Sequence, residues 1–404
     1  MLGSFNLDKT YQYLLNALAF LLPLTVFGGN LIIVIIVILW LISGNYKSKF
    51  NQIINSKLLL ASIVFFCLHV IGLLWTEDLE WGFHIIHKMW YFLLLYPILY
   101  NIVKREHIKL YVYAFLLAIL FTEVLSYLVW FEIIAPLKNA SVENPTPFMS
   151  HISYNPILGF AIYLVAHEIL FDNNLSKLKL FLYSFFAVSM IINMFITSGR
   201  AGHVMFFVMI SILILQYFNY KNYKKIKSIL IIFILIPAIF LTAYQTSNLF
   251  SDRIDETIAN IVLFSENQSK KNAVGQRLTY AINSWEVIQK NPLFGSGTGD
   301  FRVEYTRVNI VNSPELPNTH NPHNMYLLIL TQLGLLGLVS FMSIFYYQIK
   351  LSFYASNKFI RDVGFTLPIL FLVIMLSDSY LLGHYTTLMF VFFSSFLHKD
   401  FENS

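Results

Sequence analysis

Long apolar runs alternate with short polar connections along nearly the whole chain. A helix needs about 20 mostly apolar residues to cross the roughly 30 Å hydrocarbon core of a bilayer. The runs therefore predict an all-α, polytopic integral membrane protein with about 12 transmembrane helices. They fall at about residues 11–28, 30–43, 57–75, 84–103, 108–132, 153–171, 178–197, 202–218, 228–246, 323–347, 362–381 and 384–398.

The composition agrees with a membrane protein. Hydrophobic residues make up 57% of the chain and charged residues 12%, and the mean hydropathy is +0.64. These values exclude an ordinary soluble domain. The single cysteine, Cys67, lies inside an apolar run, so no internal disulfide is expected. The N-terminus lacks a basic region and a small-residue cleavage site, so its apolar run is expected to be a retained span.

Lysine and arginine residues concentrate in alternate connections, and this sets the expected orientation. Cytoplasmic loops of membrane proteins carry an excess of these residues. With the N-terminus in the cytoplasm, the inner connections hold most of them, and the short outer connections hold only Lys88, Lys138 and Arg200. Both termini are therefore expected in the cytoplasm. The net charge of +5 reflects this sorting and gives no reason to expect nucleic acid as a partner.

One outer connection is far longer than the others and is too polar to span. It divides the chain into helices 1–9 (1–246), a large periplasmic loop (247–322) and helices 10–12 (323–404). Within the loop, GQRLTYAINSWEVIQKNP has apolar residues at helical spacing and predicts an amphipathic helix on the membrane face, ending at Asn291-Pro292. The following LFGSGTGDF predicts a tight turn, with phosphate binding as a weaker alternative.

Polar chemistry meets the membrane in HNPHNMYLLILTQLGLLG, from His320 to Gly337. Pro322 suits a first helical turn, so His323 and Asn324 are expected in that turn, at the water interface. An imidazole beside the positive end of a helix dipole favours its neutral form, which can accept a proton as a general base. The alternative is that His323 only caps or anchors the helix.

Two arginines are candidates for binding an anion. Arg200, in ITSGRAGHV, lies between two closely spaced apolar runs, where a charge needs a partner, and Gly199 and Gly202 permit close backbone approach. Arg277 opens the amphipathic helix, and a guanidinium binds phosphate oxygens through parallel hydrogen bonds. The alternatives are an arginine that extends to lipid headgroups at position 200 and a solvated surface charge at position 277.

Other polar groups provide weaker signals. His320 and His323 lack further ligands with metal spacing, so no metal site is expected there. Glu77, Asp78 and Glu80 form an acidic outer loop that could hold a divalent cation but is more simply a solvated loop. For His151, an interface role is favoured over catalysis. No GxSxG, HExxH or Walker motif occurs in the chain, which argues against an ATP-driven pump and against serine and zinc proteases.

In this order, the features resemble the O-antigen ligase and O-antigen polymerase superfamily of bacterial envelope glycosyltransferases, and most closely an O-antigen ligase. The resemblance rests on TSGRAG, on RLTYAINSWEVIQKNPLFGSGTGDF in a single late outer loop, and on His323-Asn324 followed by Gly334 and Gly337. It implies a GT-C-like membrane fold with its active site facing the periplasm. By position, His323 matches the family's catalytic histidine, and Arg200 and Arg277 match its phosphate-binding arginines.

The resemblance also implies substrates and a reaction. The donor would be an undecaprenyl-diphosphate-linked glycan and the acceptor the lipid A core, so the product would be complete lipopolysaccharide. Transfer would invert the anomeric centre and need no cofactor or metal. His320, Asn324, Gly334, Gly337 and His151 are candidate supporting residues.

Several alternatives remain open at this level. An O-antigen polymerase and a protein O-oligosaccharyltransferase of the same superfamily use the same chemistry with other acceptors. A transporter of lipid-linked sugars would show helices broken at mid-membrane, whereas here the special residues gather at the outer face. A metal-dependent transferase would use Glu77 and Asp78. The glycan, acceptor sugar, linkage and oligomeric state cannot be inferred from the sequence.

Overall fold

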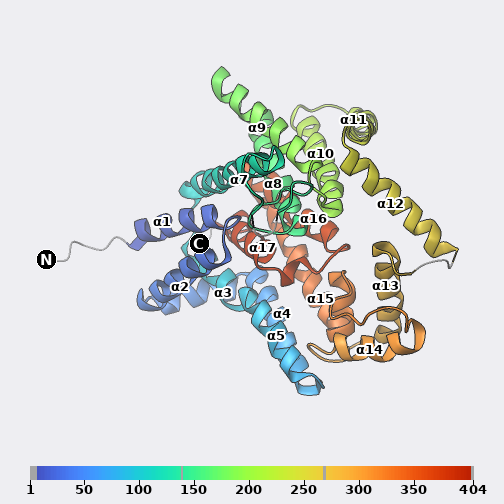
Figure 1. Cartoon of the computed structure of the whole chain (residues 1–404). Coiled ribbons are helices and arrows are strands. Elements are labelled where there is room, and N and C mark those ends of the chain that lie inside the picture. The colour runs from blue at the N-terminus through green and yellow to red at the C-terminus, as the bar shows by residue number, and fades with distance from the viewer. Residues whose placement is uncertain (1–6, 138–139, 267–269, 402–404) are drawn as a thin grey trace. The chain divides into compact units, whose positions relative to one another are not determined.

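A computed structural model describes residues 7–137, 140–266 and 270–401. Within these ranges the chain is helical and has no β-strand, which confirms the all-α prediction. The principal helices follow one another along the chain (Figure 1) as α1 (Leu7–Leu21), α2 (Val26–Ile42), α3 (Tyr46–Asn55), α4 (Lys57–Gly72), α5 (Leu79–Trp90), α6 (Tyr96–Ile102), α7 (Ile108–Trp130), α8 (His151–Phe171), α9 (Lys177–Phe195), α10 (Arg200–Tyr220), α11 (Lys225–Thr246), α12 (Asn248–Ser265), α13 (Ala273–Lys290), α14 (Phe301–Asn312), α15 (Met325–Tyr354), α16 (Lys358–Ile374) and α17 (His384–Leu397).

Seven helices in the described ranges are long and apolar enough to cross a membrane. They are Lys57–Trp75, Arg105–Trp130, His151–Phe171, Lys177–Phe195, Arg200–Tyr220, Lys225–Thr246 and Met325–Tyr354. An eighth is formed if α2 and α3, which bend by 115° relative to each other, count as one span. The chain is therefore an integral membrane protein, whereas the count of twelve spans stays a prediction.

The remaining predicted spans are shorter or interrupted. The run at 11–28 is divided by a turn at Pro23, so that α1 ends at Leu21 and α2 begins at Val26. The run at 84–103 is divided by a π-helical turn, Tyr91–Leu95, between α5 and α6. α16 ends at Ile374, and α17 is a short apolar helix. Hydropathy alone did not detect these interruptions.

The chain forms two compact units, described here separately. Unit 1 contains residues 1–14, 31–107 and 256–404, and unit 2 contains 15–30 and 108–255. In unit 1, α4 and α16 both pack along α15, α17 packs on α16 and α6, and α13 and α14 lie against α15 (Figure 1). Rings of Phe65, Phe341, Phe345 and Phe390 join these helices in the core.

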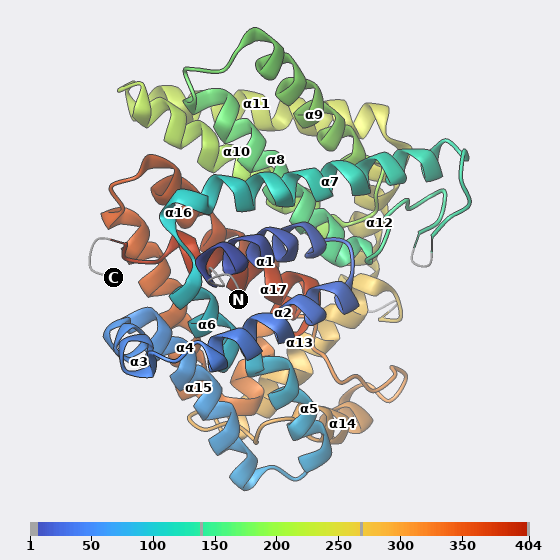
Figure 2. The same cartoon turned by 90° about the vertical axis from the view of Figure 1, so that its left-hand side faces the viewer.

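In unit 2, α8 packs against both α9 and α10, and α11 packs on α10 (Figure 2). Most of α8 is buried, whereas the large apolar side chains of α11, such as Phe233 and Ile234, are exposed. A helix that is apolar all round and yet exposed is suited to contact with lipid tails.

The predicted amphipathic helix is α13, and it ends before Asn291-Pro292 as the sequence indicates. Its polar and small residues face inward, with Thr279, Tyr280 and Asn283 buried. Its apolar residues Ile282 and Trp285 are 59% and 54% exposed, as expected of a face that lies against lipid. The helices α12 and α14 were not predicted from the sequence.

The glycine-rich segment after α13 inserts its backbone into a break in α15. Gly334 has φ 62° and ψ −159° inside that helix. The carbonyls of Pro292 and Leu293 accept hydrogen bonds from Leu335 N and Leu336 N, at 2.8 and 3.2 Å. In the other direction, Ser296 N donates to Thr331 O at 2.9 Å. The break is thus repaired by hydrogen bonds from a neighbouring segment, as kinks in membrane helices must be.

The glycines of the same segment and Thr298 have no backbone donors left for a phosphate. The N–H groups of Gly295, Gly297, Thr298 and Gly299 donate to Asn291 O, Gln332 O, Gly72 O and Gln332 Oε1. The structure therefore supports the predicted tight turn in LFGSGTGDF and not the alternative of a phosphate-binding loop.

Candidate active site

His323 precedes α15 rather than lying in its first turn. Asn324 is the N-cap residue, and its side-chain oxygen accepts hydrogen bonds from Tyr326 N and Leu327 N at 3.0 and 3.1 Å. His323 has a φ of 52°, a left-handed conformation uncommon outside glycine. The expectation that Pro322 begins the helix was wrong, because an asparagine cap satisfies the first N–H groups better. His323 is therefore placed by a loop, with its side chain 33% exposed.

Asp378 is the acidic partner of His323. It lies in the connection between α16 and α17, and its Oδ1 is 3.3 Å from Nδ1 of His323. The same oxygen accepts hydrogen bonds from Ser379 N at 2.7 Å and from Asn321 Nδ2 at 3.0 Å. Burial raises the pKa of this carboxyl, but His323 and the hydrogen bonds outweigh burial and lower the pKa overall. Asp378 is thus a carboxylate at neutral pH.

Asn321 fastens the histidine loop to the segment that carries Asp378. Its Oδ1 accepts hydrogen bonds from His323 N at 3.0 Å and from Ser379 Oγ at 2.8 Å, while its Nδ2 donates to Asp378. These three hydrogen bonds hold the backbone of His323 close to Asp378 and Ser379, and so they set the distance between the imidazole and the carboxylate. Asn321 is therefore a positioning residue.

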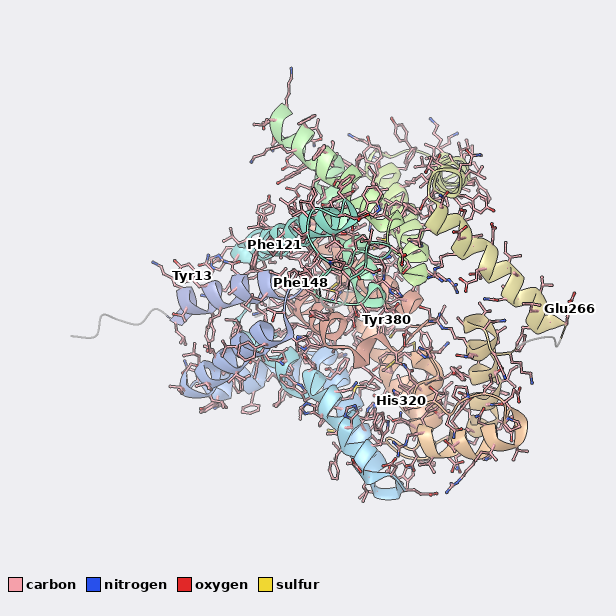
Figure 3. The ribbon with its side chains drawn as sticks, in the orientation of Figure 1. Tyr13, Phe121, Phe148, Glu266, His320 and Tyr380 are labelled. Atoms are coloured by element: carbon pink, nitrogen blue, oxygen red, sulfur yellow. The ribbon has the colours of Figure 1, made fainter. Side chains whose placement is uncertain are left out.

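α13 contributes the remaining wall of this site. The ring of Tyr280 lies nearly parallel to that of His323, with centroids 6.1 Å apart. Arg277, one turn earlier, is exposed and forms no hydrogen bond or ion pair within the described ranges. Its charge acts on the hydroxyl of Tyr380, two residues after Asp378. Tyr380 is labelled in Figure 3. Burial raises the pKa of Tyr380, and the charge of Arg277 opposes this rise. Arg277 thus lies on the helix whose Tyr280 contacts His323.

The site residues missed by sequence reasoning are Asp378, Asn321, Ser379 and Tyr280. Asp378 did carry a signal, because it is a single acidic residue at the end of a predicted span, and such residues are functional candidates by default. Asn321 stands beside His323 in the same polar motif. Tyr280 and Ser379 carried no signal, because aromatic and hydroxyl residues are common throughout this chain.

His320 belongs to a different cluster. Its ring meets the edge of Trp81 at a centroid distance of 5.2 Å, and Trp81 also stacks on His84. The described residues contain no group of three histidine, cysteine or acidic side chains placed to hold a metal. His320 and His323 thus have separate surroundings.

Two carboxylates of the acidic loop, Glu77 and Asp78, form ion pairs with arginine side chains. Glu77 receives hydrogen bonds from both terminal nitrogens of Arg307, at 3.0 and 2.6 Å. Asp78 lies 3.3 Å from Arg302 and accepts a hydrogen bond from Trp81 N as the N-cap of α5. These contacts give Glu77 and Asp78 structural roles and remove the support for a cation site there.

Arg200 is the first residue of α10 in unit 2, and the turn before it is pressed against α8. A Cβ at Gly199 would lie 2.4 Å from Nδ2 of Asn155, and one at Gly202 would lie 2.2 Å from its Cβ. Oδ1 of Asn155 also accepts a hydrogen bond from Thr197 Oγ1 at 2.8 Å. The predicted close approach at the two glycines is therefore confirmed, and Arg200 is fixed at a helix N-terminus.

His151, the first residue of α8, supports the same turn. Asn144 donates from Nδ2 to Nδ1 of His151 at 3.0 Å and accepts at Oδ1 from Ser198 N at 3.1 Å. Asn144 thus links His151 to the residue two positions before Arg200. This contact agrees with a structural role for His151.

Residues 185–342 match the family model described as O-antigen ligase. This part of the chain is therefore similar to the O-antigen ligase family. The matched residues include Arg200, Arg277, His320, His323, Asn324, Gly334 and Gly337. His151 and Asp378 lie outside the matched residues. No curated protein matches the chain. This similarity supports a ligase-type or polymerase-type function in lipopolysaccharide biosynthesis, carried out by a membrane glycosyltransferase-like enzyme on lipid-linked glycans.

Proposed function

We propose that the protein is an O-antigen ligase that transfers a glycan from undecaprenyl diphosphate to the lipid A core. Transfer would take place at the periplasmic face of the bacterial inner membrane. The observation that carries the proposal is the pairing of His323 with Asp378, against which α13 places Tyr280, with Arg277 one turn earlier on that helix and without a partner among the described residues. A proton acceptor and a phosphate-binding cation are the two groups that this reaction requires.

His323 acts as the general base. Its Nδ1 faces the carboxylate of Asp378, so a proton held on Nδ1 leaves Nε2 free to accept another. Within the described ranges Nε2 has no hydrogen-bond partner. As Nε2 takes the proton of the acceptor hydroxyl, the oxygen bonds to the anomeric carbon of the donor. The bond from that carbon to the phosphate oxygen breaks, and attack from the opposite side inverts the centre.

Arg277 binds the diphosphate, and the resemblance gives Arg200 the same role. The leaving group gains charge as the glycosidic bond breaks, and fixed guanidinium groups stabilise that charge without a metal. Arg277 is available because it has no partner among the described residues. Arg200 adds its own charge to the N-terminus of α10, where the helix dipole also favours an anion. The involvement of Arg200 rests on its position in the matched segment.

Unit 2 has a groove suited to the polyprenyl chain. A cavity of about 900 Å³ is lined mainly by apolar residues of α9 and α11, including Phe195, Ile196 and Ala243. Ile196 lies at the end of α9, four residues before Arg200. A lipid tail in this groove would place its diphosphate toward the arginine end of α10.

The test is complementation of a strain that lacks the gene with His323→Ala, Arg200→Ala and Arg277→Ala. Each variant is expected to leave the lipid A core without long glycan chains. Arg307→Ala, which removes an exposed arginine of the same outer segment, is the control and should attach glycan normally. Normal attachment by all three variants at wild-type protein levels would refute the proposal.

The glycan profile of the same strain distinguishes the acceptors. Loss of all long chains from the lipid A core indicates a ligase, whereas single-repeat addition indicates a polymerase. Loss of glycan from protein alone indicates a protein O-oligosaccharyltransferase. Transfer by purified protein that persists in a chelator supports the metal-independent mechanism, and transfer that stops would overturn it.

A further inference from the structure

A polar cavity of about 900 Å³ lies at the opposite end of unit 1 from His323. It is bounded by α3, the start of α4 and the last turns of α15, which begins just after His323. A continuous helix of the length of α15 would separate its ends by about 45 Å, more than the thickness of a bilayer core. The cavity therefore belongs to the other face of the membrane and is independent of the transfer site.

The cavity is basic and rich in hydrogen-bonding groups. Lys47, Lys57 and Lys350 line it, and none of them forms an ion pair or hydrogen bond with the residues that the structure describes. Asn51 and Gln52 of α3 add side-chain amides to the same wall. Three lysines around one cavity create a positive potential that an anion would neutralise.

The geometry of α3 identifies the surroundings as a membrane surface. The axis of α3 turns by 115° from that of α2, so α3 runs across the direction of the apolar helix that precedes it. One face of α3 carries the cavity residues, while Tyr46, Phe50 and Ile54, spaced four residues apart, are exposed. An interfacial helix has this division, with the apolar stripe in the acyl region and the polar face at the headgroups.

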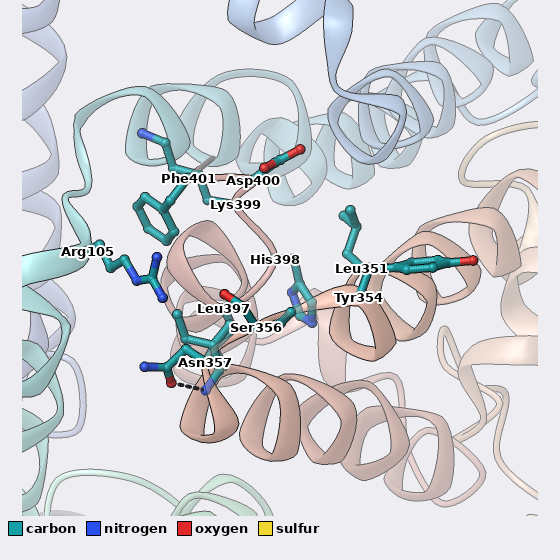
Figure 4. Close-up of a pocket in the computed structure, with 12 residues that line it drawn as sticks. Arg105, Leu351, Tyr354, Ser356, Asn357, Leu397, His398, Lys399, Asp400 and Phe401 are labelled. Carbon is teal, nitrogen blue, oxygen red and sulfur yellow. Dashed lines mark hydrogen bonds between the residues drawn. The ribbon is translucent and has the colours of Figure 1, made fainter. Parts of the chain in front are cut away.

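A smaller cavity of about 250 Å³ adjoins the first and shares Leu351, Tyr354 and Asp400 with it (Figure 4). Arg105 and Lys399 line it and add to the positive charge at this end of unit 1. Lys399 Nζ is held by Asn101 O and Val103 O, at 3.3 and 3.1 Å. One carboxylate, Asp400, lies between the two cavities, so the net charge of the described lining residues is positive.

We propose that the cavity between α3, α4 and α15 binds the headgroup of an anionic phospholipid. The lysines bind the phosphate, the amides of α3 bind the glycerol hydroxyls, and the acyl chains run along exposed Leu60 and Val64 of α4. A lipid is favoured over a free phosphate because apolar side chains exposed on α3 and α4 flank the basic wall. With His323 facing the periplasm, this lipid lies in the cytoplasmic leaflet.

The experiment measures how much lipid stabilises the purified full-length protein in detergent. Phosphatidylglycerol should raise the melting temperature more than phosphatidylcholine does. The quantity recorded is the phosphatidylglycerol concentration that gives half of the maximal rise in melting temperature. For Lys47→Gln/Lys57→Gln/Lys350→Gln this concentration should rise roughly 100-fold, because each of the three lysines near an anionic surface contributes about fivefold. The control, Lys221→Gln/Lys225→Gln/Lys227→Gln, removes the same charge in unit 2 and should leave it unchanged.

An equal rise of the half-maximal lipid concentration in the two triple variants, or no rise in either, would overturn the proposal. So would displacement of the lipid by millimolar glycerol phosphate, which would instead indicate a site for a soluble phosphate. A second measurement uses the unaltered protein with a photoactivatable phosphatidylglycerol headgroup. Labels are expected on α3 and on the last turn of α15, and labels found only elsewhere would contradict the assignment. Neither measurement depends on glycan transfer, so its outcome is separate from the proposed enzymatic function.

Discussion

Nδ1 of His323 lies 3.3 Å from Oδ1 of Asp378, although the whole of α15 and α16 separates the two residues along the chain. The carboxylate is also held by Asn321 and Ser379, so its position does not depend on the imidazole. A carboxylate fixed in this way orients the ring and stabilises the imidazolium that forms when His323 accepts a proton.

Replacement of Asp378 by asparagine is therefore expected to slow transfer without weakening donor binding. The amide keeps the shape of the side chain but loses its charge, and loss of such a supporting group costs roughly 10- to 100-fold in activity. His323→Ala should cost more, roughly 100- to 10,000-fold, because it removes the base itself. Steady-state assays on purified protein should show the loss in kcat with an unchanged KM for the donor. An equal effect in the control Asp172→Asn, in an exposed loop of unit 2, would contradict this role.

Asp378 should also make the stability of the protein pH-dependent in acid. Its native pKa is lowered from 3.8, so the unfolded chain binds a proton more readily than the native state. The stabilisation is present in full above about pH 5 and is lost as the pH falls through the lowered native pKa. Melting temperatures of the protein and of Asp378→Asn, measured in detergent, should differ at neutral pH and converge in acid. A difference in melting temperature that stays the same at every pH would show that the charge of the carboxylate does not contribute to stability.

Sequence patterns predicted well those features that depend on local chemistry. α13 ends before Asn291-Pro292 because proline cannot continue a helix, and Gly199 and Gly202 mark a close approach because no side chain fits there. The acidic partner of His323 depends on a loop that returns after two helices. No local pattern encodes that contact, so only the structure identifies Asp378 as part of the site.

The start of α15 shows where two local rules compete. Pro322 and Asn324 are both good residues for the beginning of a helix, one at its first position and the other as its cap. The structure uses Asn324, because Asn321 bonds to His323 N and Ser379 and holds the preceding loop in a non-helical conformation. Contacts distant in sequence thus determine which of the two signals is used.

Gly334→Ala is expected to destabilise the protein more than Gly44→Ala. Both glycines have a positive φ, 62° and 65°, but a Cβ at Gly334 would lie 2.4 Å from the Leu293 backbone, whereas at Gly44 nothing lies within 4 Å. Gly44→Ala should therefore cost only conformational strain, about 1–2 kcal/mol. Gly334→Ala should cost about 3 kcal/mol or more, because overlap adds to the strain. Thermal unfolding in detergent measures the loss of stability in each variant. Equal losses of stability in the two variants would show that the 292–299 segment can move aside.

The groove in unit 2 makes a prediction about donor binding. Thr242→Trp places a large ring into the cavity between α9 and α11, and the KM for the polyprenyl-linked donor should rise roughly tenfold. The adjacent Leu241 is 54% exposed and does not line the cavity, so Leu241→Trp should bind the donor normally. The comparison requires assays over a range of donor concentrations. An unchanged KM in Thr242→Trp would place the lipid tail elsewhere.

Arg277 should act through its guanidinium shape as well as its charge. Its planar fork can donate two parallel hydrogen bonds to a diphosphate, and a lysine supplies only a point charge. Arg277→Ala should therefore lower kcat/KM by roughly 100-fold and Arg277→Lys by roughly tenfold, in line with hydrogen bonds to charged groups. Arg307→Ala, in the same outer segment, provides the matched control. Full activity of Arg277→Lys would mean that charge alone suffices, and full activity of Arg277→Ala would remove this residue from the diphosphate site.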